Sequence, residues 1–303
     1  MNNDEIRADA LNSLGNIYRN QGDLQRAEEM YLKSLKIEET LQNQRGIAVN
    51  YGNLGTVYAI QGDFQRAEEM YFKSLEIEEA LGLKQGVAIN YSNLGNLYVN
   101  RGDLQLAEQL YFESLGMNHQ LQNQEGIASD YGNLGVLYET RGDLQRAQEM
   151  YLKSLKMAKA LDNQEGIANN YNNLGNIYSA RGDLEPAQEM YFKSLEINQT
   201  LGRQKSIANN YSNLGNIYRR RGELQCAEEM YLKSLEINQS SGLKEGIASA
   251  YGNLGNLYRL QKEVERAETM YLKSIKIFKD MGNPHANIVQ QWLKEFKKSV
   301  AYA

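Results

Sequence analysis

The sequence has few of the residues on which covalent cross-links, metal sites and domain linkers depend. Of 303 residues, one is cysteine, two are proline and two are histidine. The single Cys226 cannot form an intrachain disulfide, and one cysteine with two histidines gives no recognisable zinc-ligand spacing. No apolar run approaches the roughly 18 residues of a membrane span, and the N-terminus lacks a basic-then-apolar signal segment. These absences predict a cytoplasmic protein without a metal or a cofactor.

The charges of the chain are nearly balanced. It carries 33 basic and 38 acidic residues, a net charge of −5. This balance predicts a soluble protein without general attraction to nucleic acid or anionic membranes. The only prolines, Pro186 and Pro284, form no proline-rich linker. With 42% hydrophobic residues the chain can bury a core, so we expect one continuous body.

Repetition is what the sequence has in abundance. A shift of forty residues nearly reproduces the text, from YGNLGTVY at residue 51 to YSNLGNLY at 91 and YNNLGNIY at 171. Seven such units fill residues 1–282, and residues 283–303 depart from the pattern. Self-similarity at a period of roughly 20–50 residues is the signature of stacked repeat folds. Residues 1–282 are therefore predicted to be one repeat array.

Each unit is predicted to contain two helices, called here the A helix and the B helix. In the second unit, apolar residues at spacings of three and four predict the A helix over residues 49–60. Gly62 suits the positive φ that follows a helix end, and Asp63 is a good N-cap for the B helix. We expect this B helix over residues 64–81. The array is then all-α.

Tyrosine and glycine recur at fixed positions, which are named below after the residues of the second unit. Twenty of the 21 tyrosines occupy the positions of Tyr51, Tyr58 and Tyr71. Aromatic residues at helical spacing in every unit indicate core packing, not base stacking or a cofactor site. All seven units carry a glycine at the Gly55 position, inside the A helix. We expect it to let the B helix approach closely.

The pattern resembles the tetratricopeptide repeat. The residues that carry the resemblance are Tyr51, Leu54, Gly55, Tyr58, Ala67 and Tyr71. The usual unit has about 34 residues and often a proline ending the B helix, whereas this unit has forty and no proline there. The longer unit is similar to those of Pins/LGN-type spindle-orientation scaffolds and, more loosely, of kinesin light chains and bacterial sensor proteins. The resemblance implies a right-handed α-solenoid (a superhelix) of stacked antiparallel helix pairs, with the A helices lining its concave surface. It also implies a non-enzymatic scaffold that binds other proteins.

The two ends of the array differ from its internal units, as expected where one face has no neighbouring unit. The first unit has Leu11 and Ser13 where the others have tyrosine and asparagine. Near the other end, Asn283 can cap a helix with Pro284 at its first position. An apolar stripe follows, made of Ile288, Val289, Trp292, Leu293 and Phe296. Residues 283–303 are therefore predicted to be a C-terminal capping helix and tail.

Asparagine recurs at two positions that point away from the core side of the A helix. With 100° per residue and Tyr51 as the centre of the core side, Asn53 lies about 200° away and Thr56 about 140° away. The Asn53 position holds Asn53, Asn93, Asn133, Asn173, Asn213 and Asn253. The Thr56 position holds asparagine as Asn16, Asn96, Asn176, Asn216 and Asn256. If the A helices line a concave surface, these residues form an asparagine-lined groove.

Two interpretations of these asparagines stay open. An asparagine amide offers two donors and an acceptor without net charge, which suits the backbone groups of an extended peptide. Alternatively, the amides bond to one another, to water or to the neighbouring helix, and recent duplication copied them, since exposed polar residues are usual on a solvated helix face. The resemblance favours peptide binding.

The positions that vary between units change the character of the groove along the array. Apolar side chains lie near units two and three and small polar ones in the centre, whereas Arg219, Arg220 and Arg259 lie near units six and seven. Arginines can bind carboxylates or a phosphate by bidentate hydrogen bonds, although cations also suit helix C-termini. We expect a protein or peptide partner with an acidic segment at the C-terminal units.

Other functions find less support in the residues. Cys226 takes an outer position of a B helix, so a catalytic cysteine–histidine pair is not expected. The glutamates recur as a solvated face, and no glycine-rich phosphate loop follows a strand, so we expect no enzyme. RNA binding would need a basic stripe along the whole groove. A self-associating array, joined through the N-terminal unit, and the sensor part of a larger regulator stay open as alternatives.

Overall fold

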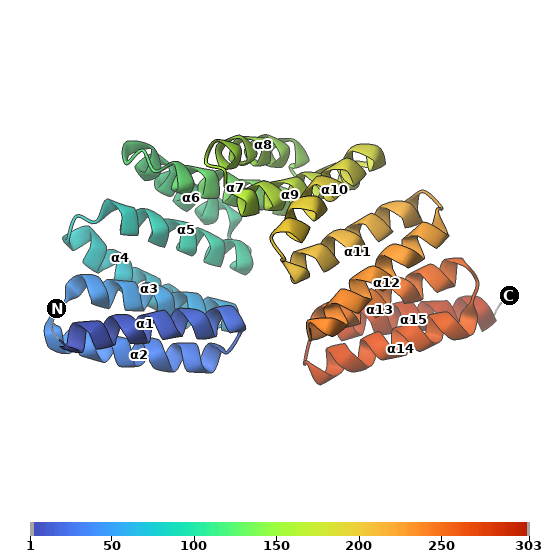
Figure 1. Ribbon diagram of the computed structural model, residues 1–303, viewed down its shortest axis with the longest axis horizontal. Helices are drawn as coiled ribbons and strands as arrows, with labels where there is room; N and C mark the ends of the chain where they lie inside the picture. The colour runs from blue at the N-terminus through green and yellow to red at the C-terminus, as the bar shows by residue number, and fades with distance from the viewer. Residues whose placement is uncertain (1–2, 302–303) are drawn as a thin grey trace. The chain divides into compact units, whose positions relative to one another are not determined.

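The computed structural model describes residues 3–301, which form fifteen α-helices and no strand (Figure 1). The chain divides into two compact units, residues 1–161 and residues 162–303. That the whole chain forms one continuous body stays a prediction.

The first unit contains four helix pairs. They are α1 (Asn3–Gln21), α2 (Leu24–Leu41), α3 (Gln44–Gln61), α4 (Phe64–Ala80), α5 (Lys84–Arg101), α6 (Leu104–Gln120), α7 (Gln124–Thr140) and α8 (Leu144–Ala160). The second unit contains three helix pairs and a final helix. They are α9 (Gln164–Arg181), α10 (Leu184–Thr200), α11 (Gln204–Arg220), α12 (Leu224–Ser240), α13 (Lys244–Leu260), α14 (Val264–Asp280) and α15 (His285–Ala301).

Local chemistry sets the boundary between the two helices of a pair. After α3, Gly62 takes φ 81° and ψ 8°, the left-handed conformation that ends a helix at little cost to glycine. Asp63 then accepts a hydrogen bond from the backbone N–H of Arg66 at 3.1 Å and caps α4. Both predictions are confirmed. The A helix starts earlier than residue 49 because Asn43 caps it, accepting from the backbone N–H of Gly46 at 3.3 Å.

Each A helix packs closely on its own B helix, and each B helix then packs on the next A helix within its unit. The glycine inside the A helix explains the close approach. A Cβ added at Gly55 would lie 2.7 Å from the ring of Tyr71, a distance that side-chain contacts do not reach. The same glycine–tyrosine pair occurs in all seven repeats. The all-α solenoid of stacked antiparallel helix pairs is therefore confirmed within each unit.

A buried polar layer joins each B helix to the following A helix. Ser74 of α4 donates to the backbone oxygen of Ala48 in the preceding α3 at 2.9 Å. Asn90 donates to the Ser74 hydroxyl at 2.9 Å and to the carboxylate of Glu78 at 2.8 Å. These polar groups are hydrogen-bonded to one another, although burial still raises the pKa of Glu78, with the hydrogen bond from Asn90 opposing the shift. The direction of the hydrogen bonds also fixes how successive pairs are placed.

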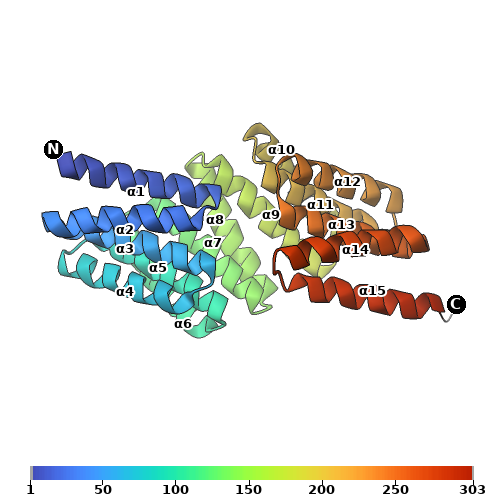
Figure 2. The same ribbon diagram turned by 90° about the horizontal axis from the view of Figure 1, so that it is seen from below.

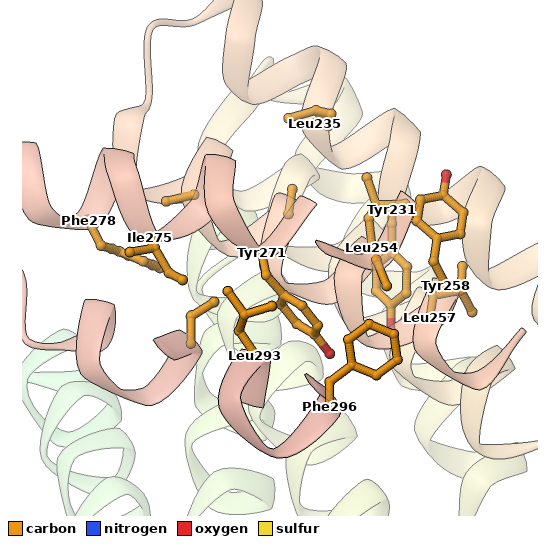
Figure 3. Packing of buried hydrophobic residues seen from close by; sticks show 14 of the residues in the cluster. Tyr231, Leu235, Leu254, Leu257, Tyr258, Tyr271, Ile275, Phe278, Leu293 and Phe296 are labelled. Carbon is orange, nitrogen blue, oxygen red and sulfur yellow. The ribbon is translucent and has the colours of Figure 1, made fainter. Parts of the chain in front are cut away.

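Helix α15 covers the last helix pair, as predicted for a capping helix. It runs along α14 at the edge of the second unit (Figure 2). Leu293 and Phe296 are buried, and the rings of Tyr271 and Phe296 meet edge to face with centroids 6.2 Å apart (Figure 3). Trp292 is half-buried against the same cluster. Ile288 differs from the prediction, because it is 46% exposed on the outer side of the helix.

The start of α15 also differs by one residue from the prediction. The Asn283 side chain accepts a hydrogen bond from the backbone N–H of His285 at 2.9 Å, so it caps the N-terminus of α15 as predicted. The helix begins at His285, and Pro284 lies in the turn before it.

Candidate functional site

The A helices form the more closely spaced side of each unit. Consecutive A helices contact each other, α3 with α5, α5 with α7 and α11 with α13, whereas no two B helices in residues 3–301 reach a comparable contact. The surface formed by the Asn53, Thr56, Ala59 and Ile60 positions of the A helices is called here the inner face. It carries every residue that the sequence assigns to peptide binding.

The asparagines at the Thr56 position share a role that the sequence analysis missed. Each accepts, through its side-chain oxygen, a hydrogen bond from the tyrosine hydroxyl of its own B helix. The pairs are Asn16 with Tyr31 (2.9 Å), Asn96 with Tyr111 (2.7 Å), Asn176 with Tyr191 (2.8 Å), Asn216 with Tyr231 (2.7 Å) and Asn256 with Tyr271 (2.9 Å). The tyrosine ring passes over the glycine of the A helix, so its hydroxyl reaches the inner face.

The fourth repeat shows how strictly this hydroxyl requires an acceptor. It has Val136 at the Thr56 position, and there the Tyr151 hydroxyl donates to Glu139, one turn further along α7, at 2.8 Å. Burial raises the pKa of Tyr151, with the Glu139 charge adding to the effect. In the second repeat Thr56 accepts from the Tyr71 hydroxyl at 3.3 Å, so a side-chain acceptor is kept there as well.

The hydrogen bond to tyrosine changes what the inner face offers a ligand. In each pair the asparagine oxygen accepts from tyrosine, so a peptide would mainly meet the amide N–H groups, except at Asn16, whose amide already donates to the side-chain oxygen of Asn12 at 3.3 Å. The face is therefore richer in donors than in acceptors. Donors suit the backbone carbonyls and carboxylates of a partner.

The asparagines at the Asn53 position lie half-buried between successive A helices. Asn53 donates to the side-chain oxygen of Asn12 at 3.4 Å, and Asn213 donates to that of Asn172 at 3.1 Å. Asn53 and Asn213 thus bond to asparagines of the neighbouring A helix, and their binding of a peptide stays a prediction. The other members, Asn93, Asn133, Asn173 and Asn253, are half-buried at the same seam.

The three predicted arginines do not act alike. Arg220 donates through Nη1 to the backbone oxygen of Ser179 at 2.6 Å and to its hydroxyl at 2.9 Å, so it binds the last turn of α9. Arg219 is half-buried and Arg259 is exposed, on successive A helices of the second unit. Burial raises the pKa values of the tyrosines beside them, Tyr231 and Tyr271, and the arginine charges oppose the shift. Arg219 and Arg259 therefore share the inner face with the asparagine donors.

A polar hollow adjoins the asparagine-rich stretch NNYNNLGNIY. It has a volume of about 280 Å³ between α9, α10 and α11. Its lining is Asn169, Asn172, Asn173, Ser194, Asn198, Ser206, Asn209 and Asn210. A second polar hollow of about 350 Å³ lies at the corresponding place between α1, α2 and α3. The first is lined by amide and hydroxyl groups, whereas the second also has the charged side chains of Asp9, Glu38 and Arg45 in its wall.

The described part of the chain shows no cluster of metal-binding side chains and no helix suited to span a membrane. Residues 3–301 hold no cluster of three or more histidine, cysteine, aspartate or glutamate side chains able to bind a metal. Cys226 is exposed on α12, as predicted. None of the described helices is both long enough and apolar enough to cross a bilayer.

Comparison with known families identifies the repeat. The tetratricopeptide repeat matches residues 6–80, 46–120, 86–160, 126–200 and 206–280. The chain belongs to the tetratricopeptide-repeat family, whose members generally serve as protein-interaction scaffolds and are typically not enzymes. No curated protein sequence matches the chain significantly.

Several solved structures share the fold. BtubC (BKLC) from P. vanneervenii is 24% identical with a TM-score of 0.63, over 72% of this chain and 92% of its own. A STAND protein with a tetratricopeptide repeat sensor from Pyrococcus horikoshii is 16% identical with a TM-score of 0.73, over 95% of this chain and 44% of its own. A Podosopora anserina putative kinesin light chain with nearly identical TPR-like repeats is 18% identical with a TM-score of 0.52, over 67% of this chain and 99% of its own. The likeness to kinesin light chains is thus confirmed at the level of fold, and the Pins/LGN likeness stays a prediction.

Proposed function

We propose that the chain is a scaffold that binds an extended peptide segment along the inner face, with an acidic stretch of the partner at the arginines of the second unit. The observation that carries the proposal is the set of donors there. Asn216 and Asn256 have their oxygens occupied by tyrosine, and Arg219 and Arg259 stand one turn further along the same helices.

Chemical complementarity supports the acidic stretch. Amide N–H groups can hold backbone carbonyls independently of the partner's side chains, while guanidinium groups bind carboxylates in bidentate fashion. The half-buried position of Arg219 restricts its motion, so less side-chain entropy is lost on binding. Arg220 contributes mainly by supporting the face, because its guanidinium is already bound to α9.

A peptide-display selection tests this function. Random peptides of about twelve residues are selected against the immobilised protein, and the affinities of the enriched peptides are measured by fluorescence anisotropy. We expect peptides with clustered aspartate and glutamate. In the double variant Arg219→Gln, Arg259→Gln, their binding should weaken by about tenfold or more, since charged hydrogen bonds contribute about 1.5–3 kcal/mol each.

The matched control is Lys233→Gln, which removes one positive charge from the same unit but on the exposed side of α12. It should leave the affinity unchanged. The proposal is wrong if no peptide is enriched, or if enriched peptides bind the double arginine variant and the parent equally well.

The alternative of a sensor within a larger regulator has one observation in its favour. The chain matches a tetratricopeptide repeat sensor over 95% of its own length but only 44% of that protein. The mass of the native protein in the source cells decides the matter. A native mass equal to the 34.5 kDa of this chain would contradict the alternative.

A further inference from the structure

The first helix carries an apolar stripe that nothing in residues 3–301 covers. The stripe consists of Ile6, Ala10, Leu14 and Ile17, spaced three or four residues apart along α1. Ile6 is 52% exposed and Ile17 is 50% exposed. An exposed stripe of large aliphatic residues on one helix marks an interaction surface.

The internal repeats show what this stripe is built to contact. Leu54 and Val57 occupy the positions of Leu14 and Ile17 in the second repeat, and they are 1% and 0% exposed because α2 packs on them. Leu14 by contrast is 42% exposed. The first helix thus keeps the stacking residues of an internal repeat, and no helix within residues 3–301 covers them.

The other end of the repeat array does not offer a matching surface. By the forty-residue period, Lys294–Glu295 of α15 stands where α13 has Leu254–Gly255, so charged residues occupy the place on which a B helix would pack. The groove between α14 and α15 is rimmed by Lys279, Lys294, Lys297 and Lys298. Helix α1 carries Asp4, Glu5 and Asp9 beside Arg7, so the exclusion of a head-to-tail contact rests on the missing leucine–glycine pair and not on charge.

We propose that the stripe on α1 binds the same stripe of a second copy, which gives a closed dimer with two-fold symmetry. Such an interface must be self-complementary. When two α1 helices pack antiparallel with Ile6 facing Ile17 of the second copy, the same register brings Ala10 opposite Ser13 and sets Leu14 beside Asp9 at the flank of the interface. Small side chains near the middle of the helix let the two backbones approach closely.

Charge and helix dipole favour the same arrangement. The acidic residues of α1 lie in its first turn, Asp4 and Glu5, and the basic residue of its last turn is Arg19. Antiparallel packing brings the acidic end of each helix near the basic end of the other. It also sets the positive end of one helix dipole beside the negative end of its neighbour. Parallel packing would bring like charges together at both ends.

Sedimentation velocity over about 1–100 μM tests the dimer. The parent chain should sediment as a dimer at the upper concentrations, and Ile17→Glu should be a monomer throughout, because its carboxylate would be buried in the interface. We expect a dissociation constant raised by about a hundredfold or more. The control is Leu232→Glu, which places the same charge on a residue 45% exposed on α12 and should leave the dimer intact. Circular dichroism checks that both variants stay helical.

A cross-linking measurement locates the contact independently of any loss of stability. In a Cys226→Ser background, Ala10→Cys should give covalent dimers with a short thiol-to-thiol cross-linker, and Ala180→Cys on α9 should not. The inference is overturned if the parent is a monomer up to about 100 μM, as it would be if another segment or a different partner covers the stripe. It is also overturned if Ile17→Glu remains dimeric or if Ala10→Cys fails to cross-link.

Discussion

Two glycines inside helices of the first unit differ in the space available for a side chain. A Cβ added at Gly95 of α5 would lie 2.5 Å from Cε1 of Tyr111, whereas nothing lies within 4 Å of a Cβ added at Gly116 of α6. The first glycine is required by the close approach of two helices. The second lies in an exposed helix interior, where glycine only costs helix stability.

The two glycines therefore predict alanine substitutions of opposite sign. Gly95→Ala should lower the free energy of unfolding by about 1–3 kcal/mol through overpacking. Gly116→Ala should raise it by up to about 1 kcal/mol through helix propensity. Urea denaturation followed by circular dichroism measures both. Equal effects of the two substitutions would mean that the tyrosine ring is not tightly held over the A helix.

At the scale of helices, the buried polar layer decides how each pair sits on the next. Between α6 and α7 this layer contains Asp130, where four other repeats have asparagine and the first and seventh repeats have alanine. Its carboxylate accepts from Ser92 at 2.5 Å, from Ser114 at 3.0 Å and from Asn118 at 2.7 Å. Burial nevertheless raises the pKa of Asp130, because the hydrogen bonds only partly replace the lost water.

The raised pKa gives a pH dependence with a definite sign. A raised pKa in the folded state means that Asp130 favours folding when protonated, and this contribution is lost as the pH rises through the folded-state pKa. Asp130→Asn should therefore raise the free energy of unfolding at pH 7 by about 1 kcal/mol. The gain should shrink toward about pH 3, where the parent aspartate is neutral. Urea denaturation at several pH values measures it.

Asp143 serves as the control of opposite sign in the same unit. Its pKa is lowered, first by the hydrogen bond that it accepts from the backbone N–H of Arg146. Asp143→Asn should destabilise the protein at neutral pH, with a loss that disappears as the pH falls. If both asparagine variants change stability in the same direction, the assigned burial effect at Asp130 is incorrect.

At the scale of the whole chain, the two ends of the repeat array differ in whether a helix covers their apolar surface. The last helix pair is covered by α15, with Val289, Leu293 and Phe296 buried, whereas the stripe on α1 is open. Each of the three buried side chains contributes about 1.5–3 kcal/mol by leaving water. Removing α15 would expose the apolar surface of α13 and α14. That surface could then contact the stripe on α1.

Truncation after Gly282 should therefore change how the protein associates. We expect oligomers larger than a dimer, growing with concentration, because the exposed surface of α13 and α14 can accept α1 of another copy. Light scattering after size-exclusion chromatography measures the mass. The same truncation combined with Ile17→Glu should stay small, and circular dichroism should show that it remains helical. A truncated chain of the same mass as the parent would contradict this expectation.

The sequence by itself determined the features that depend on neighbouring residues along the chain. The forty-residue period, the helix breaks at Gly62 and Asp63 and the close packing at Gly55 follow from helix geometry and the conformational range of glycine. These rules act within one repeat, and the same local pattern recurs in each of the seven repeats. The capping helix was predicted for the same reason, although the outward turn of Ile288 was not.

Only the tertiary structure decided which groups the polar side chains hydrogen-bond. Asn216 and Tyr231 are far apart in sequence, and their hydrogen bond depends on how deeply the tyrosine ring passes over a glycine of the other helix. The binding of Arg220 to α9 likewise depends on the placement of two A helices. Helix periodicity gives the direction of a side chain but not the distance to a neighbouring helix. The exposure of the stripe on α1 is decided in the same way, by whether another helix pair stands beside it.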